Sequence, residues 1–127
     1  MSLTAFRTLG RSGLVVSPLA LGTMTFGTPR WGSPDEVSGA IFDAYVEAGG
    51  NFVDTAEGYS GGGSEELLGA LIRKRSLRDG MVIATKFTTG YQGYKGHDKI
   101  IQSNFGGNNA KGMRLSVEAS LRKLQTN

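Results

Sequence analysis

The sequence predicts an α/β fold built on a parallel β-sheet, and three observations support this fold class. Short apolar runs end at Gly22, Asp54 and Lys86, which are 32 residues apart in both intervals. Amphipathic helical patterns fill the gaps, and this spacing is the length of one strand–helix unit. Each run is apolar on both faces, as in parallel strands that are covered on both sides. Right-handed crossovers are expected between the strands.

A small hairpin is expected before the first of these runs. Residues 6–10 and 14–17 are rich in residue types that favour strands, and a Ser-Gly turn separates them. This pattern predicts a β-hairpin over residues 6–17. Residues 18–127 are then expected to hold three βα units, so that residues 1–127 form a single partial domain.

The first helix is expected after the run that ends at Gly22. Ser33–Glu36 matches a capping box with proline at the first helical position. Apolar residues then follow at helical spacing, and they predict one buried face. The residues of this predicted face are Val37, Ile41, Ala44, Tyr45 and Ala48.

Two further helices follow the second and third runs. One begins near Ser64 and is expected to bury Leu67, Leu68, Leu71 and Ile72. The other extends from about Met113 to Leu124, with Val117, Leu121 and Leu124 on one face. About 26 residues with little periodicity precede the last helix and contain the only histidine, His97. A loop of that length predicts a lid beside a binding site, and we interpret His97 as a surface residue.

Composition excludes several classes of protein. The chain has 127 residues, a net charge of +3 and no cysteine, so neither a disulfide framework nor a thiolate metal site is expected. It has no apolar stretch of the ~20 residues that span a bilayer. The one basic cluster, Arg73–Arg75 with Arg78, follows a predicted helix, where cations complement the helix dipole. We therefore expect a cytoplasmic protein without a metal site, a membrane partner or a nucleic-acid partner.

Two architectures fit this order of elements: the start of a (β/α)8 TIM barrel, or an open doubly wound sheet. The glycines of Gly22–Gly27 do not have the G-x-G-x-x-G spacing, so a Rossmann dinucleotide site is not supported. A complete barrel needs ~250 residues. Three units cannot close one, so the barrel is expected to be incomplete in this chain.

Three polar residues follow the ends of predicted neighbouring strands: Asp54, Tyr59 and Lys86. The carboxyl ends of parallel barrel strands share one rim, and adjacent strands lie ~4.8 Å apart, so these side chains are expected to meet. An ammonium lowers the pKa of a neighbouring tyrosine, which can then donate a proton to a carbonyl oxygen as hydride reaches the carbon. From the residues alone, a purely structural ion pair or an Asp54 turn cap remains an alternative.

Several segments resemble motifs of the aldo-keto reductase family, in order, from about residue 6 to the end. They are Leu21–Gly27 (the first-strand motif), Asp54–Tyr59 with Gly63–Gly69 (the signature after the second barrel strand), Ile83–Phe87 (the lysine strand) and Leu115–Thr126 (the third barrel helix). Residues 84–88 and the loop after them look most like the aryl-alcohol dehydrogenase branch of the family.

The resemblance implies an NADP-dependent oxidoreductase that reduces aldehydes or ketones to alcohols. Tyr59 would be the general acid, Lys86 would lower the pKa of Tyr59, and Asp54 would hold Lys86. With Asp54, the residues that would line the nicotinamide side of an NADP(H) pocket are Gly22, Thr23 and Met24. The substrate would be a small carbonyl compound. Trp31 is expected either to shape the substrate pocket or to anchor its loop.

The resemblance also implies that parts of the family's site lie outside this chain. The family's fourth-strand histidine and its later cofactor-binding strands are expected after Asn127. Two alternatives to a catalyst therefore stay open: a non-catalytic NADP-binding subunit and an inactive truncated fragment. A homo-oligomer, or a complex with the complementary remainder of the barrel, is the expected assembly.

Overall fold

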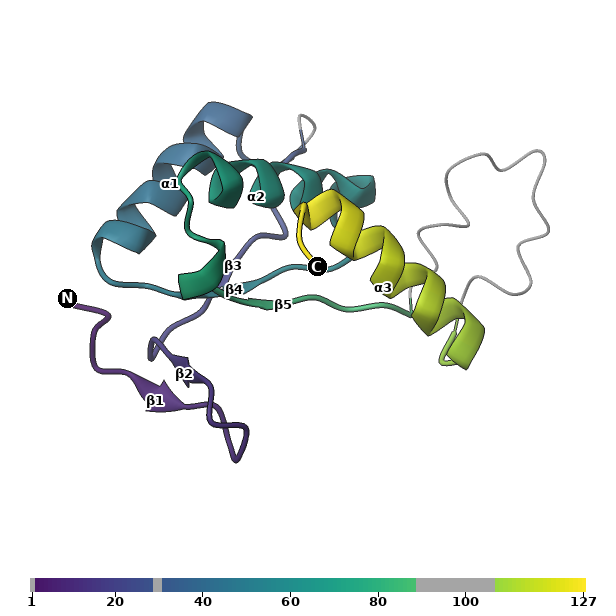
Figure 1. Cartoon of the computed structure of the whole chain (residues 1–127). Coiled ribbons are helices and arrows are strands. Elements are labelled where there is room, and N and C mark those ends of the chain that lie inside the picture. Colours follow the sequence, from purple (N-terminus) through teal and green to yellow (C-terminus); the bar gives the residue numbers. More distant parts are fainter. Residues whose placement is uncertain (1, 29–30, 89–106) are drawn as a thin grey trace.

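The computed structural model describes residues 2–28, 31–88 and 107–127, and it has the predicted α/β architecture with a parallel sheet (Figure 1). The hairpin pairs β1 and β2 antiparallel, and the three-stranded sheet has the order β3–β4–β5. The elements in chain order are β1 (Arg7–Thr8), β2 (Val15–Val16), β3 (Leu21–Gly22), α1 (Asp35–Glu47), β4 (Phe52–Asp54), η1 (Tyr59–Gly62), α2 (Gly63–Lys74), η2 (Arg78–Gly80), β5 (Val82–Ala84) and α3 (Ala110–Leu124).

The register of the parallel sheet decides which residues share a face. Val53 lies opposite Leu21 on β3 and Ile83 on β5, and Asp54 lies opposite Gly22 and Ala84. Successive side chains of a strand point to opposite faces. All three helices lie on one side of the sheet (Figure 1). Val53 is buried on the helix side, so Asp54 points to the face that these helices leave uncovered.

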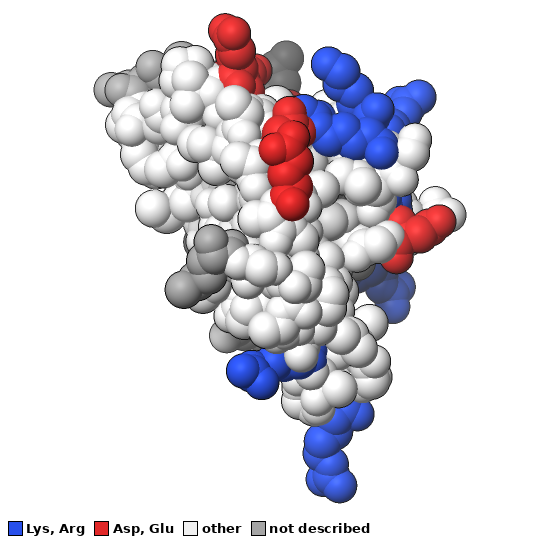
Figure 2. Space-filling view, turned by 90° about the vertical axis from the view of Figure 1, so that its left-hand side faces the viewer, with Lys and Arg blue, Asp and Glu red and all other residues white. Residues whose placement is uncertain are grey.

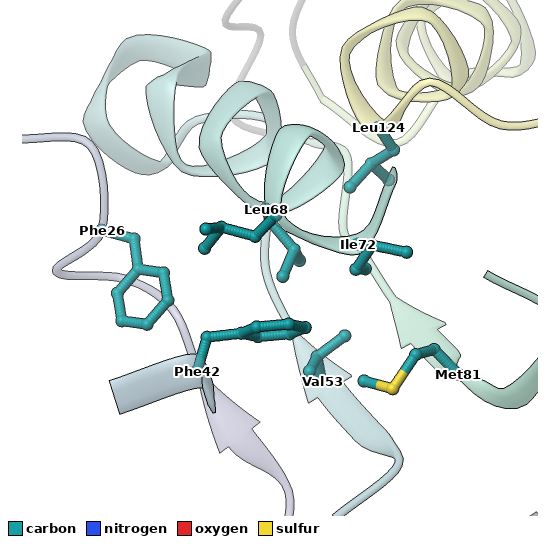
Figure 3. Close-up of a cluster of buried hydrophobic side chains, with 8 residues drawn as sticks. Phe26, Phe42, Val53, Leu68, Ile72, Met81 and Leu124 are labelled. Atoms are coloured by element: carbon teal, nitrogen blue, oxygen red, sulfur yellow. The ribbon is translucent and has the colours of Figure 1, made fainter. Parts of the chain in front are cut away.

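The hydrophobic core lies between the sheet and the helices (Figure 3). Each large apolar side chain that is fully buried contributes about 1.5–3 kcal/mol to folding. Helix α2 supplies the predicted residues Leu68, Leu71 and Ile72, and Leu67 packs half-buried against them. The other members of the buried cluster are Phe26, Phe42, Val53, Met81 and Leu124.

The predicted inner face of α1 is only partly right: Tyr45 packs half-buried against the core, but the longer aliphatic residues do not. Val37 and Ile41 are 47% and 41% exposed, whereas Ser38, Gly39 and Phe42 are buried. Gly39 also faces α2, where an added Cβ would make an ordinary contact at 3.5 Å with Leu71. The aromatic ring of Phe42, rather than the longer aliphatic stripe, therefore faces the core.

The start of α1 also differs from the predicted capping box. The helix begins at Asp35, and no side chain caps its first turn. Pro34 is extended, with φ −53° and ψ 154°, and its carbonyl oxygen accepts the first helical hydrogen bond from Ser38. The amide of Ser33 instead donates to Thr25 in the loop after β3. That bond holds Ser33 outside the helix.

Helix α3 begins three residues before the predicted start, because Asn109 Oδ1 accepts a hydrogen bond from the Gly112 amide at 2.7 Å. Its predicted face is only partly right: Leu124 is buried, but Val117 is 47% exposed. The other buried residues of α3 are all small: Gly112, Ser116, Ala119 and Ser120. Most of the predicted loop between Lys86 and Met113, namely residues 89–106 with His97, lies outside the described residues.

The basic cluster begins in the last turn of α2 and makes contacts within the molecule. Arg75 pairs with Asp43 of α1 and lies over the Phe42 ring at 5.6 Å. The hydrogen bond from Arg75 lowers the pKa of Asp43 below its usual value. Arg73 donates to Gln125 and Arg78 to Thr126. The cluster thus links α2 to its two neighbouring helices.

No described helix has the length and apolar character to cross a membrane. Residues 2–28, 31–88 and 107–127 contain no group of three or more His, Cys, Asp or Glu side chains that could hold a metal ion.

Candidate active site

The side chains of Asp54, Tyr59 and Lys86 meet, as the strand spacing predicts. The Lys86 ammonium donates hydrogen bonds to Asp54 Oδ2 at 2.7 Å and to the Tyr59 hydroxyl at 3.4 Å. It also donates to the carbonyl oxygen of Thr55 at 2.7 Å. The same ammonium lies 5.0 Å from the centre of the Tyr59 ring. One cation therefore contacts a carboxylate, a phenol and a backbone carbonyl.

The backbone ladder between β4 and β5 explains this convergence. Beyond the strand ends, the Thr55 amide donates to the carbonyl oxygen of Ala84 at 2.9 Å, and the Glu57 amide donates to the backbone carbonyl oxygen of Lys86 at 3.1 Å. Lys86 follows Ala84 by one pleat, so its side chain lies on the same face as Asp54. Glu57 is fully buried, and nothing in the described residues provides a hydrogen-bond partner for its carboxylate oxygens.

A strained turn presents Tyr59. Within η1, Ser60 and Gly61 have φ values of 51° and 63°, and Gly62 has a φ of 93°. The left-handed conformation costs a non-glycine residue roughly 1–2 kcal/mol. The Ser60 hydroxyl offsets part of that cost by donating to the Phe26 carbonyl oxygen at 2.8 Å. The turn thereby fixes Tyr59 above the strand ends rather than leaving it on a free loop.

The electrostatics keep Lys86 charged. Partial burial disfavours the ammonium, but the hydrogen bonds to Asp54 and Tyr59 outweigh this effect and raise the pKa of Lys86 above its usual value. The Lys86 and Asp54 side chains are still 48% and 37% exposed. A small molecule can therefore reach a permanent positive charge and a phenol at this rim.

Buried hydroxyl groups brace the rim from beneath, and the sequence did not predict this network, although it named Thr23 as a cofactor residue. Thr23, Thr55 and Ser64 are fully buried. Ser64 Oγ donates to the Thr23 carbonyl at 2.6 Å and lies 3.0 Å from Thr55 Oγ1. Thr23 Oγ1 donates to the carbonyl oxygen of Asp54 at 3.1 Å. The only sequence signal was the position of two threonines directly after the predicted strands.

The predicted cofactor residues differ in their exposure to solvent. Gly22 and Met24 are exposed, with Met24 at 50%, whereas the side chain of Thr23 is buried in the hydroxyl network. A Cβ added at Gly22 would meet nothing within 4 Å. Gly22 also pairs with Asp54 across the sheet. The rim beside Asp54 therefore has open space for a flat ring.

Trp31 is 61% exposed in the loop after β3, so it is not packed as an apolar anchor in this structure. Residues of the same loop and of the start of α1 line a cavity of about 470 Å³. The lining residues are Gly27, Thr28, Gly32, Pro34 and Asp35. That volume falls within the range of small-molecule sites, ~300–1,000 Å³.

Proteins similar to this chain are known. The sequence matches the model of the Aldo/keto reductase family over residues 18–127. It is 50% identical over 116 residues to norsolorinic acid reductase B of Dothistroma septosporum, covering 88% of this chain and 29% of that protein. It is 43% identical over 121 residues to the NADP(+) aryl-alcohol dehydrogenase of Phanerodontia chrysosporium, covering 90% and 31%.

The fold agrees as well. An aldo-keto reductase from Pseudomonas aeruginosa superposes with a TM-score of 0.75 at 35% identity, covering 98% of this chain and 44% of the solved chain. The present chain spans less than a third of the length of the two curated relatives, at 29% and 31%.

Proposed function

This chain belongs to the aldo/keto reductase family, and from that premise we propose that the full-length protein reduces an aldehyde or ketone to an alcohol with NADPH. One observation carries the proposal: the Lys86 ammonium is 2.7 Å from Asp54 Oδ2 and 3.4 Å from the Tyr59 hydroxyl. A charged lysine beside an accessible phenol is the arrangement that makes a tyrosine an effective proton donor.

Each of the three side chains has a role in proton transfer. The oxygen of Tyr59 accepts a hydrogen bond from Lys86, so its own proton can point away from the lysine, toward a substrate carbonyl oxygen. When that proton is donated, the Lys86 ammonium stabilises the phenolate that remains. Asp54 holds the ammonium in place through a charge-assisted hydrogen bond. Tyr59 then regains a proton from water.

The cofactor supplies the hydride that reaches the carbonyl carbon. We propose that Gly22, Thr23, Met24 and Asp54 lie along its nicotinamide side. The open space beside Gly22 and the exposure of Met24 support this placement. The buried hydroxyl of Thr23 leaves that residue a supporting role beneath the rim. A preference for NADP is supported by the name of the aryl-alcohol dehydrogenase relative.

The test is turnover by the full-length protein. NADPH and an aromatic aldehyde are mixed with enzyme, and the loss of nicotinamide absorbance is followed. Tyr59→Phe removes the proton donor, so kcat is expected to fall about 10²–10⁴-fold while NADPH binding is retained. The matched control is Tyr45→Phe, because the Tyr45 hydroxyl bonds to Leu19 and Phe52, at the start of β4. This control should lose stability but keep kcat.

Other results would point to a different function. Tight NADPH binding without turnover of any carbonyl compound would identify a non-catalytic binding subunit. Full activity in Tyr59→Phe would contradict the proposed proton donor.

A further inference from the structure

Two adjacent residues in the first turn of α2 are tied to two different strand ends. Ser64 and Glu65 are both fully buried. Ser64 Oγ lies 3.0 Å from Thr55 Oγ1, directly after β4. Glu65 Oε1 accepts a hydrogen bond from Thr85 Oγ1 at 2.7 Å, directly after β5. One helical turn therefore contacts the ends of both strands that carry Asp54 and Lys86.

The carboxylate of Glu65 is fixed on its other side by α3. Lys123 Nζ donates to Glu65 Oε2 at 3.1 Å, and the Lys123 side chain is only 12% exposed. Helix α3 can approach this closely because Gly69, one turn after Glu65, faces its last turn: an added Cβ would lie 2.5 Å from the Lys123 carbonyl oxygen. A buried carboxylate with a partner on each oxygen is held in one geometry.

The hydrogen bonds of Ser64 and Glu65 reach residues next to Lys86. The Thr55 hydroxyl is hydrogen-bonded to Ser64, and the Thr55 carbonyl oxygen accepts a hydrogen bond from the Lys86 ammonium. Thr85 precedes Lys86, so its hydroxyl bond to Glu65 limits the movement of the Lys86 backbone. Tyr59 lies in η1, which leads directly into α2. The positions of all three candidate catalytic residues thus depend on the first turn of α2.

We propose that Ser64 and Glu65 are positioning residues, which set the distance from Lys86 to Asp54 and Tyr59 through the hydroxyls of Thr55 and Thr85. The inference rests on the proposed reductase function, because it concerns the same three side chains. A lysine side chain has four flexible carbons, so the place of its ammonium depends on where its backbone is held. An error of about 1 Å in such a site can lower the rate ~10²-fold.

Thr85→Val in the full-length protein is the most direct test, because valine has nearly the shape of threonine and replaces the hydroxyl with a methyl group that cannot donate to Glu65. Thr85→Ser keeps the hydroxyl, and Thr85→Ala is the second variant if valine impairs folding. Ile72→Val is the matched control for lost stability, since Ile72 lies two turns after Glu65 in the same helix, is 1% exposed in the core and has an apolar side chain that forms no hydrogen bond. Three quantities are measured: kcat, KM for NADPH, and the titration of the Lys86 side chain by NMR.

The expected result is selective. Thr85→Val and Thr85→Ala should lower kcat about ten-fold or more, change KM for NADPH by less than about two-fold, and lower the pKa of Lys86 toward its ordinary value. Thr85→Ser should stay within about two-fold of the parent protein. If Thr85→Val and Thr85→Ala lower only the melting temperature, as Ile72→Val does, and leave kcat and the Lys86 titration unchanged, the positioning role is wrong.

The NMR titration separates this inference from the proposed function. If the parent protein reduces no carbonyl compound but Lys86 titrates high and falls in Thr85→Val, the reductase assignment fails and the positioning role stands. If the parent protein is active and Thr85→Val matches it in both measurements, only the positioning role fails.

Discussion

Lys86 is the residue on which the rim geometry depends, because its ammonium contacts Asp54, Thr55 and Tyr59 at once. The ion pair with Asp54 needs the positive charge. An uncharged amine would still donate a hydrogen bond but would neither pair with the carboxylate nor stabilise a phenolate. The charge of Lys86 should therefore be visible in the pH dependence of folding as well as in catalysis.

We predict that Lys86 stabilises the fold only while it is charged. Its folded pKa lies above the ordinary value of 10.5 because of Asp54 and Tyr59. The stabilisation is therefore fully present below about 10.5 and is lost as the pH rises through the folded pKa. Denaturant unfolding of the parent protein and of Lys86→Met measures it at neutral and at strongly alkaline pH. A stability difference that stays constant over this range would contradict the pairing.

The contact between the three side chains could be predicted, but the groups that support it could not. Asp54 and Lys86 follow neighbouring parallel strands, and the register of such strands fixes which side chains share a face. The Thr55 carbonyl carries no residue-type signal, because every residue has one. Glu65 looked like an ordinary first-turn carboxylate that favours the helix dipole. Only the packing of α3 shows that it is buried and paired.

At the scale of elements, apolar spacing identified the helices but not always their inner faces. For α2 the apolar stripe is the buried face. In α1 and α3, exposed residues such as Val37 and Val117 continue an apolar pattern beyond the buried side. The faces that pack closely contain small residues instead, because glycine, serine and alanine allow backbones to approach. Hydrophobic periodicity does not detect that kind of contact.

Gly69 is the clearest case of a small residue required by packing. Its added Cβ would lie 2.5 Å from the Lys123 carbonyl oxygen and 2.7 Å from the Leu124 backbone, so α3 would have to move. We predict that Gly69→Ala destabilises the protein by about 1–3 kcal/mol. Denaturant unfolding measures the loss.

A matched glycine in α1 provides the control. A Cβ at Gly39 would make an ordinary contact at 3.5 Å with Leu71. Gly39→Ala should therefore be neutral or stabilise the protein by about 0.5–1 kcal/mol, since glycine is unfavourable inside a helix. Equal effects at both positions would show that helix propensity, rather than the α2–α3 contact, decides the outcome.

At the scale of the molecule, large surfaces of this chain have no partner in the described residues. The helices cover one face of the sheet, and β3 and β5 each have one neighbouring strand. Val37 and Ile41 of α1 and Met113 and Val117 of α3 are exposed. Figure 2 views the molecule from the α1 side, and most of that face carries no charged side chain. Open strand edges and apolar helix faces favour association.

We therefore predict that the 127-residue chain, expressed alone, aggregates or associates with copies of itself. Light scattering after size-exclusion chromatography measures its mass in solution. A monodisperse 13.5 kDa monomer that unfolds cooperatively would contradict this prediction and would show that the exposed faces are tolerated.

The central claim is that Tyr59 and Lys86 act as one proton-donating unit. A double-mutant cycle on kcat in the full-length protein tests it most directly, with Tyr59→Phe, Lys86→Met and the combined variant. Residues that act as a unit give strongly non-additive losses. We expect the combined variant to be about as slow as the slower single variant. Losses that multiply would show that the two side chains act independently, and would contradict the claim.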